Sequence, residues 1–119
     1  MPIRTKRVYE DGSPADGRRI LVDRLWPRGV SKARARIDFW AKDIAPSNEL
    51  RRWYQHEGSK WPEFKRRYFA ELAEIPEAIT ELRTRMGSGQ VTFIFSSKET
   101  ERNNASALKE YFESQPRIA

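Results

Sequence analysis

The sequence predicts an α/β protein of three layers, α/β/α, in which helices cover both faces of a small, mostly parallel sheet. Short apolar stretches rich in β-branched and aromatic residues alternate with segments whose apolar residues recur every three or four positions. One stretch, VTFIFSS at 91–97, is apolar almost throughout, as is typical of a strand buried on both faces of a parallel sheet. The length of 119 residues, without a repeat or linker, predicts one domain, residues 1–119.

Two strands are expected before the first long helix. Residues 3–9 alternate polar with apolar or β-branched side chains, and the turn-rich EDGSPADG follows them. The stretch RILVDRL, residues 19–25, is the second expected strand. Alternation along it gives one face with Ile20, Val22 and Arg24 and another with Leu21, Asp23 and Leu25. Two charged side chains therefore fall on apolar faces near the carboxyl end of this strand.

Helical spacing predicts four helices in the rest of the chain. The first is capped by Ser47 and ends before Gly58, and the second runs from about Ser59 until Pro76 interrupts it. The third runs from about Glu77 to Met86. After the strand at 91–97, the loop SKET leads into a last helix with Ala105, Leu108, Tyr111 and Phe112 on its core stripe.

Composition limits the possible chemistry. The chain has no cysteine, which excludes disulfides, thiolate metal sites and a thiol nucleophile. It has neither a signal-peptide pattern nor an apolar run long enough to span a membrane, so we expect a cytoplasmic protein with no membrane partner. The net charge of +6 is uneven: residues 1–36 hold 10 Lys and Arg against 4 Asp and Glu, whereas residues 37–119 hold 13 of each. A basic segment favours anionic partners, although many solvated surfaces are basic without one.

Polar residues follow two expected strands, and this position predicts a binding site. Ligands of open parallel sheets lie beyond the carboxyl ends of the strands, where loops and helix N-termini meet. A helix that begins there also offers free N–H groups and a positive dipole end to an anion. We predict an anion site formed by Arg24, Trp26, Arg28, Ser96, Ser97, Lys98, Asn103 and Asn104.

The segment Trp26-Pro27-Arg28-Gly29 would hold an arginine in a defined place. Pro27 fixes its own backbone and favours extended geometry at Trp26, and Gly29 permits a sharp turn. An alternative remains open, in which Trp26 fills the core and Arg28 points into water. The sequence contains neither the P-loop nor the dinucleotide-binding glycine pattern.

Asp23 and His56 are the candidate catalytic residues. Asp23 is expected either to pair with Arg24, Arg28 or Lys98 as a structural group or to act as a general base or ligand-orienting group, and we favour the structural pair. His56, the one histidine, titrates near neutrality, but a histidine near a helix C-terminus is more often a dipole partner. We expect no metal, because no carboxylate cluster has suitable spacing, and no cofactor.

Three motifs, RILVDRLWPRGVSK, WAKDIAPSNELRRWYQH and FIFSSKETERNNA, follow one another along the chain. In this order they resemble the YeaO-like group of domain-of-unknown-function family 488 over nearly the whole length. The resemblance implies a small three-layer α/β domain and brings no established activity. Other branches of the family carry a cysteine where this chain has Ser96-Ser97, so thiol chemistry does not transfer. The matching signature positions are Asp23, Arg24, Trp26, Pro27, Arg28, Gly29, Lys42, Asp43, Pro46, Ser47, Arg51, His56, Lys98, Asn103 and Asn104.

Two functions remain after this reading. The first is the binding of a small anion bearing phosphate, nucleotide or carboxylate groups, with enzymatic turnover left open. The alternative is a nucleic-acid-binding or regulatory module that uses the basic first third, extended by Arg51 and Arg52. The chain carries no helix-turn-helix or RNA-recognition signature, so we expect only weak, non-specific nucleic-acid binding. The sequence does not define the oligomeric state.

Overall fold

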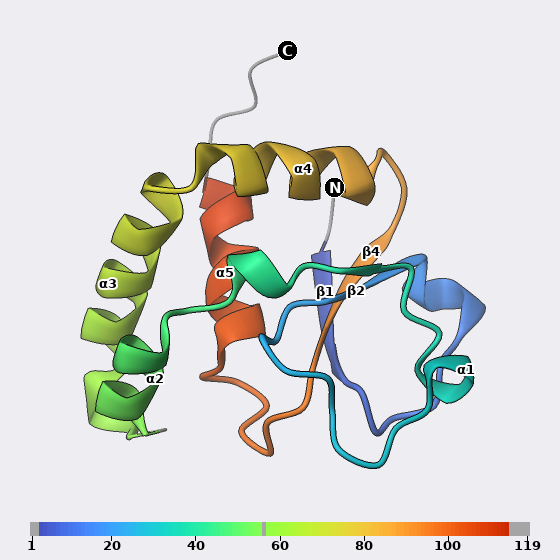
Figure 1. Ribbon diagram of the computed structural model, residues 1–119, viewed down its shortest axis with the longest axis horizontal. Helices are drawn as coiled ribbons and strands as arrows, with labels where there is room; N and C mark the ends of the chain where they lie inside the picture. Colours follow the sequence, from blue (N-terminus) through green and yellow to red (C-terminus); the bar gives the residue numbers. More distant parts are fainter. Residues whose placement is uncertain (1–2, 56, 115–119) are drawn as a thin grey trace.

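The computed structural model describes residues 3–55 and 57–114, and its centre is one all-parallel sheet (Figure 1). The strand order is β1-β4-β2-β3, and every neighbouring pair is parallel. This confirms the predicted α/β class with a small parallel sheet. The strands are β1 (Ile3–Arg7), β2 (Arg18–Leu21), β3 (Phe39–Trp40) and β4 (Val91–Phe95).

The apolar run at the end of the sequence forms the central strand, as predicted. All five residues of β4 are buried, and the strand pairs with β1 on one side and with β2 on the other. The strands β1 and β2 both begin level with the first residue of β4, because Ile3 and Arg18 are each registered with Val91. A strand with partners on both edges and side chains buried on both faces favours apolar residues. Thr92 is the polar exception, and its hydroxyl donates to the carbonyl of Asp16 at 2.8 Å.

Five α-helices and three short 3₁₀ helices are assigned in the described ranges. Ser47 is the N-cap of α2, as predicted, and its hydroxyl accepts a hydrogen bond from the backbone N–H of Leu50 at 3.1 Å. Pro76 begins α4 rather than merely ending the helix before it. The helices are α1 (Lys32–Ala35), α2 (Asn48–Tyr54), α3 (Trp61–Ala73), α4 (Pro76–Met86), α5 (Asn104–Ser114), η1 (Pro14–Asp16), η2 (Lys42–Ile44) and η3 (Gly58–Lys60).

The layers on the two faces of the sheet differ in thickness. On one face, Ile20, Phe93 and Phe95 pack in a large core to which the longer helices contribute, including Leu72, Leu82 and Leu108. On the other face, Leu21 and Ile94 pack in a small cluster with Ala35 of α1, Trp26 and Trp40. The second outer layer therefore consists of one short helix and the chain around it. In the described residues, no helix is long and apolar enough to cross a membrane.

A buried ion cluster holds the amino-terminal side of β2. Asp16, which is 4 % exposed, accepts hydrogen bonds from the Nη1 of Arg19 at 2.6 Å and from the Nζ of Lys6 at 3.2 Å. Burial raises the pKa of Asp16, but hydrogen bonds from the Ser13 backbone, Arg19 and Lys6 outweigh burial, so that its pKa lies below the usual value. These bonds compensate for burying the charges.

The second strand is shorter than the sequence predicts. It ends at Leu21, not at residue 25, and the chain turns away from the sheet after Val22 donates to the carbonyl of Ile94. Asp23, Arg24 and Leu25 therefore lie in a loop, and the predicted alternation of faces does not extend to them. Leu25, which was expected on an apolar face, is 69 % exposed. The charged side chains thus follow the strand instead of interrupting it.

Candidate ligand-binding site

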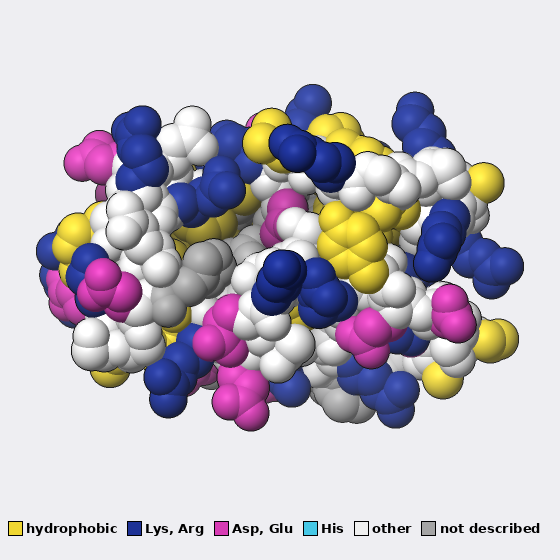
Figure 2. Space-filling model, turned by 90° about the horizontal axis from the view of Figure 1, so that it is seen from below, with side chains coloured by type: hydrophobic (Ala, Val, Ile, Leu, Met, Phe, Trp, Pro, Cys, Tyr) yellow, Lys and Arg dark blue, Asp and Glu magenta, His cyan; other side chains and the backbone are white. Residues whose placement is uncertain are grey.

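A pocket of about 710 Å³ opens beyond the carboxyl ends of β2 and β4. Figure 2 views the molecule from this end and shows a hollow with hydrophobic side chains at its floor and Lys and Arg side chains beside it. The loops after β1, β2 and β4 meet α2 and α3 around this hollow. It is lined by Tyr9, Asp23, Arg24, Leu25, Trp26, Pro27, Arg28, Ala45, Pro46, Asn48, Arg51, Arg52, Tyr54, Phe64, Ser96, Ser97, Asn103 and Asn104.

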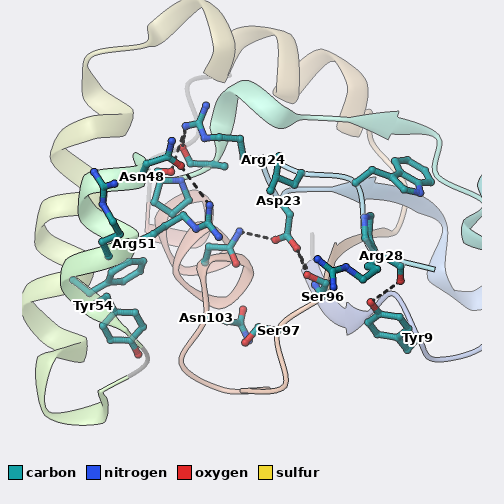
Figure 3. Close-up of a pocket in the computed structure, with 18 residues that line it drawn as sticks. Tyr9, Asp23, Arg24, Arg28, Asn48, Arg51, Tyr54, Ser96, Ser97 and Asn103 are labelled. Atoms are coloured by element: carbon teal, nitrogen blue, oxygen red, sulfur yellow. Dashed lines mark hydrogen bonds between the residues drawn. The ribbon is translucent and has the colours of Figure 1, made fainter. Parts of the chain in front are cut away.

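Neutral donors hold the Asp23 carboxylate in this pocket (Figure 3). Its Oδ2 accepts hydrogen bonds from the backbone N–H of Ser96 at 2.9 Å and from the Ser96 hydroxyl at 2.8 Å. Its Oδ1 accepts one from the Nδ2 of Asn104 at 3.1 Å. Within the described residues, Asp23 makes no ion pair with Arg24, Arg28 or Lys98, so the expected pair with a basic residue is wrong. Hydrogen bonds from backbone and amide groups supply the compensation instead.

The two asparagines at the start of α5 have structural partners. The Oδ1 of Asn103 accepts a hydrogen bond from the backbone N–H of Ser106 at 2.9 Å, and its Nδ2 donates to the carbonyl of Glu99 at 2.7 Å. Asn104 donates to the carbonyl of Val22 at 3.1 Å as well as to Asp23. Asn103, which was predicted to belong to the anion site, is therefore the cap of α5. One N–H at the start of the helix is therefore already engaged by the protein.

Arg24 has an unusual environment, because one of its polar atoms is buried without a partner. The Nη2 of its guanidinium donates to the carbonyls of Ala45 and Pro46, each at 3.3 Å. Its Nε is buried and has no hydrogen-bond partner in the described part of the chain. A buried donor without a partner costs about 1–3 kcal/mol relative to a satisfied one.

Three further arginines of the pocket, Arg28, Arg51 and Arg52, are exposed. The Nη1 of Arg51 lies 3.5 Å from the Oδ1 of Asn48, and the backbone carbonyl of Arg28 accepts a hydrogen bond from the Tyr9 hydroxyl at 3.1 Å. Sequence reasoning gave Arg51 and Arg52 a role only as an extension of the basic surface in the alternative nucleic-acid-binding function. Lys98 is exposed and does not line the pocket.

The segment from Trp26 to Gly29 is anchored as its composition predicts. The Trp26 indole N–H donates to the carbonyl of Val30 at 2.7 Å, and its ring packs edge-on against Trp40 with 5.5 Å between centroids. Pro27 is buried, and Gly29 has a φ of 77°, which favours glycine. Trp26 thus belongs both to the small core and to the pocket wall, so the two readings of this residue are compatible.

The loop after β4 is fixed from β1. Arg7 donates from its Nε to the carbonyl of Ser97 at 2.8 Å and from its Nη2 to the carbonyl of Ser96 at 3.1 Å. The Arg7 guanidinium also lies over the Tyr9 ring, 4.9 Å from its centroid. Sequence reasoning did not find Arg7 or Tyr9, because no local pattern places either residue next to a loop that follows 90 residues later in the chain.

Aromatic residues of α2 and α3 close the opposite side of the pocket. Tyr54 and Phe64 are both buried and lie with 4.4 Å between ring centroids. Burial raises the pKa of the Tyr54 phenol, as does the nearby charge of Glu99, and the phenol donates to the carbonyl of Arg102 at 2.9 Å. This wall is apolar and neutral. His56, the second candidate catalytic residue, lies outside the described residues.

Fold and site together define a small parallel α/β domain with an arginine-lined pocket at the carboxyl end of its sheet. Residues 2–117 match the family described as the inactive DUF488-N3 subclade, and the chain belongs to this YeaO-like family of domains of unknown function. The uncharacterized protein Rv3073c of Mycobacterium tuberculosis is 44% identical over 106 residues, 89% of each chain. The uncharacterized protein YeaO of Escherichia coli is 40% identical over 114 residues, 96% of this chain and 99% of YeaO. No solved structure matches the chain.

Proposed function

We propose that this domain binds a small organic anion in the pocket at the carboxyl ends of β2 and β4, without chemical turnover. The observation that carries the proposal is the charge of the lining. Among the described residues, the pocket lining contains one carboxylate, that of Asp23, and four arginines, Arg24, Arg28, Arg51 and Arg52. Arginine presents a planar set of donors that suits carboxylate and phosphate oxygens, and pairs of this kind are stronger than neutral hydrogen bonds.

The buried Nε of Arg24 supports the same conclusion. Its N–H has no partner in the described chain, while the Nη2 of the same guanidinium is held by two carbonyls. The guanidinium is therefore oriented before any ligand arrives, which lowers the entropy lost on binding. An anion oxygen that accepts from this edge would remove the cost of the unsatisfied donor.

Two observations favour binding over catalysis. The Asp23 carboxylate already accepts three hydrogen bonds from the protein, so most of its roughly four acceptor positions are occupied by structural partners. The family that the chain matches is described as an inactive subclade. Because the chain has no cysteine, we also propose a cytoplasmic location.

Thermal unfolding in the presence of phosphate, phosphate monoesters and carboxylates tests the proposal. A ligand at about 100 times its dissociation constant stabilises the folded state by roughly 2.7 kcal/mol. We expect this stabilisation for at least one anion, and we expect Arg24→Gln to reduce it. The control is Arg34→Gln, which removes the same charge from an exposed residue that does not line the pocket. Equal responses in both variants, or no response to any anion, would overturn the proposal.

Nucleic-acid binding is the second candidate, and the contacts of the basic first third disfavour it. Of the ten Lys and Arg in residues 1–36, Lys6, Arg7, Arg18, Arg19 and Arg24 donate hydrogen bonds within the protein. Arg19 is 4 % exposed. Part of the excess positive charge of residues 1–36 is therefore engaged in contacts within the protein. A salt titration separates the candidates, because duplex DNA binding falls with log salt at a slope of roughly −0.9 per phosphate contact.

A further inference from the structure

We propose that the ligand of this pocket is a phosphate monoester on a body that carries a ring and hydroxyl groups, the chemistry of a nucleoside monophosphate. This inference rests on the proposed function and names its ligand class. Four observations support it separately: the volume of the pocket, the positive charge of its lining, the hydrogen bonds of the Asp23 carboxylate and the position of the exposed apolar side chains.

The pocket is larger than a free inorganic anion requires. Its volume of about 710 Å³ lies within the range of roughly 300–1,000 Å³ that is usual for clefts that bind whole organic molecules. An arginine at one side of a space this large leaves most of it for the rest of the ligand. The anion is therefore one group of a larger molecule.

The charge of the lining favours a phosphate monoester over a monocarboxylate. Four arginines and one aspartate give the described lining a clear excess of positive charge. A phosphate monoester carries a charge of roughly −1.5 to −2 near pH 7 and has three strong acceptor oxygens. It can therefore receive hydrogen bonds from more than one arginine at a time.

Asp23 indicates that the ligand also carries a donor. An ionised carboxylate has about four acceptor positions. The Oδ2 of Asp23 accepts two hydrogen bonds and its Oδ1 accepts one, from Asn104. An additional donor can approach Oδ1 from the pocket that Asp23 lines. A sugar hydroxyl supplies that donor and keeps the phosphate of the same molecule away from the carboxylate.

The exposed apolar side chains supply a surface for a ring. In the described ranges, the exposed large hydrophobic residues are Tyr9 at 42 % and Leu25 at 69 %, and both line this pocket. Arg28 follows Leu25 in the same loop, and its carbonyl is bonded to Tyr9. Tyr9 and Arg28 therefore lie together at one side of the pocket that Leu25 also lines (Figure 3 labels Tyr9 and Arg28). A planar base that packs against Leu25 or against the part of the Tyr9 ring left exposed by Arg7 would remove apolar surface from water.

Isothermal titration with five kinds of probe tests this ligand class: inorganic phosphate, ribose 5-phosphate, adenosine, the four common nucleoside 5′-monophosphates and a 5′-phosphorylated oligonucleotide. We expect at least one nucleoside monophosphate to bind at least fivefold more tightly than ribose 5-phosphate, the smallest gain that a stacked base typically provides. Leu25→Ser should reduce that difference. Arg24→Gln should weaken both, and Arg34→Gln neither.

The outcomes separate this inference from the proposed function. If ribose 5-phosphate binds as tightly as every monophosphate and Arg24→Gln weakens it, the ring is not recognised: the ligand class is wrong and the anion site stands. If adenosine binds as tightly as its monophosphate, the phosphate is not recognised and the inference fails. If the oligonucleotide binds more than tenfold tighter than the free monophosphates, the partner is a nucleic acid end, not a small molecule. If no phosphate-bearing probe binds, the inference is also overturned.

Discussion

Replacing Asp23 with asparagine tests how the pocket is held together. In the native protein the carboxylate accepts three hydrogen bonds, two from Ser96 and one from Asn104. An asparagine at residue 23 has one acceptor oxygen, which can keep both bonds from Ser96 when it takes the place of Oδ2. Its amide nitrogen then faces the amide nitrogen of Asn104, and two donors meet. Asn104 cannot turn its amide over without losing its bond to the carbonyl of Val22.

The expected cost follows from that geometry. Asp23→Asn removes one hydrogen bond to a charged acceptor and weakens two others, so we expect a loss of about 1.5–3 kcal/mol of unfolding free energy. A broken buried ion pair would instead cost about 3–5 kcal/mol, since the remaining charge would be left without a partner. The magnitude therefore distinguishes a carboxylate held by neutral donors from one held by a cation.

Urea unfolding at pH 7 measures this difference, provided the slope of the transition is unchanged. Asp11→Asn is the matched control, because it makes the same change in charge at an exposed residue. We expect that variant to stay within about 0.5 kcal/mol of the parent. If Asp23→Asn is no less stable than this control, the hydrogen bonds do not stabilise the fold and the reasoning is refuted. A loss at the upper end, near 5 kcal/mol, would reveal a cationic partner.

Three further predictions concern the scaffold. Because the pKa of Asp16 in the folded protein lies below its usual value, the stability that Asp16 contributes should be complete above about pH 4 and should disappear as the pH falls through the folded pKa. Urea unfolding of the parent and of Asp16→Asn between pH 7 and pH 2 measures this contribution, and identical dependences of stability on pH in the two proteins would refute it. Ser47→Ala should lower the free energy of unfolding by about 0.5–2 kcal/mol, because α2 loses its N-cap and the backbone N–H of Leu50 loses its acceptor. Thermal unfolding should show a larger loss of stability than for Ser31→Ala, which removes the cap of the one-turn α1. Gly17→Ala should lower the free energy of unfolding by about 2–6 kcal/mol, because φ at Gly17 is 64° and the new Cβ would overlap the carbonyl of Gln90. Gly89→Ala should be tolerated because open space surrounds that residue, and equal unfolding midpoints for the two variants would contradict this prediction.

The elements that could be predicted are those with a local pattern. The strand β4 is recognisable because a strand buried on both faces is apolar at nearly every position, and α2 because Ser47 precedes a regular apolar spacing. The two-residue β3 and the four-residue α1 were not predicted. Elements this short contain only about one period of their pattern, which is too little to recognise in the sequence, and tertiary contacts define them.

The site was predictable in position and less so in its contacts. Arg24, Arg28 and Ser96 were expected beyond the strand ends, and they do line one pocket, because parallel strands present their carboxyl ends at the same edge. The partners of Asp23 were predicted wrongly, since alternation was extended past the last residue of β2. Arg51 came to the pocket through the packing of α2, a long-range event that its own segment does not encode.

The strand order also determines when this protein can fold as it is synthesised. β1 and β2 do not pair with each other, because β4 lies between them. β2 ends at Leu21 and β4 begins at Val91, so at about 5–20 residues per second the ribosome needs roughly 4–14 seconds to supply the strand that joins them. During that interval the nascent chain presents unpaired strands with apolar side chains. A message truncated before Val91 would therefore yield a chain with only the short β2–β3 pair of its sheet, and the growing polypeptide is most exposed to aggregation just before its last quarter emerges.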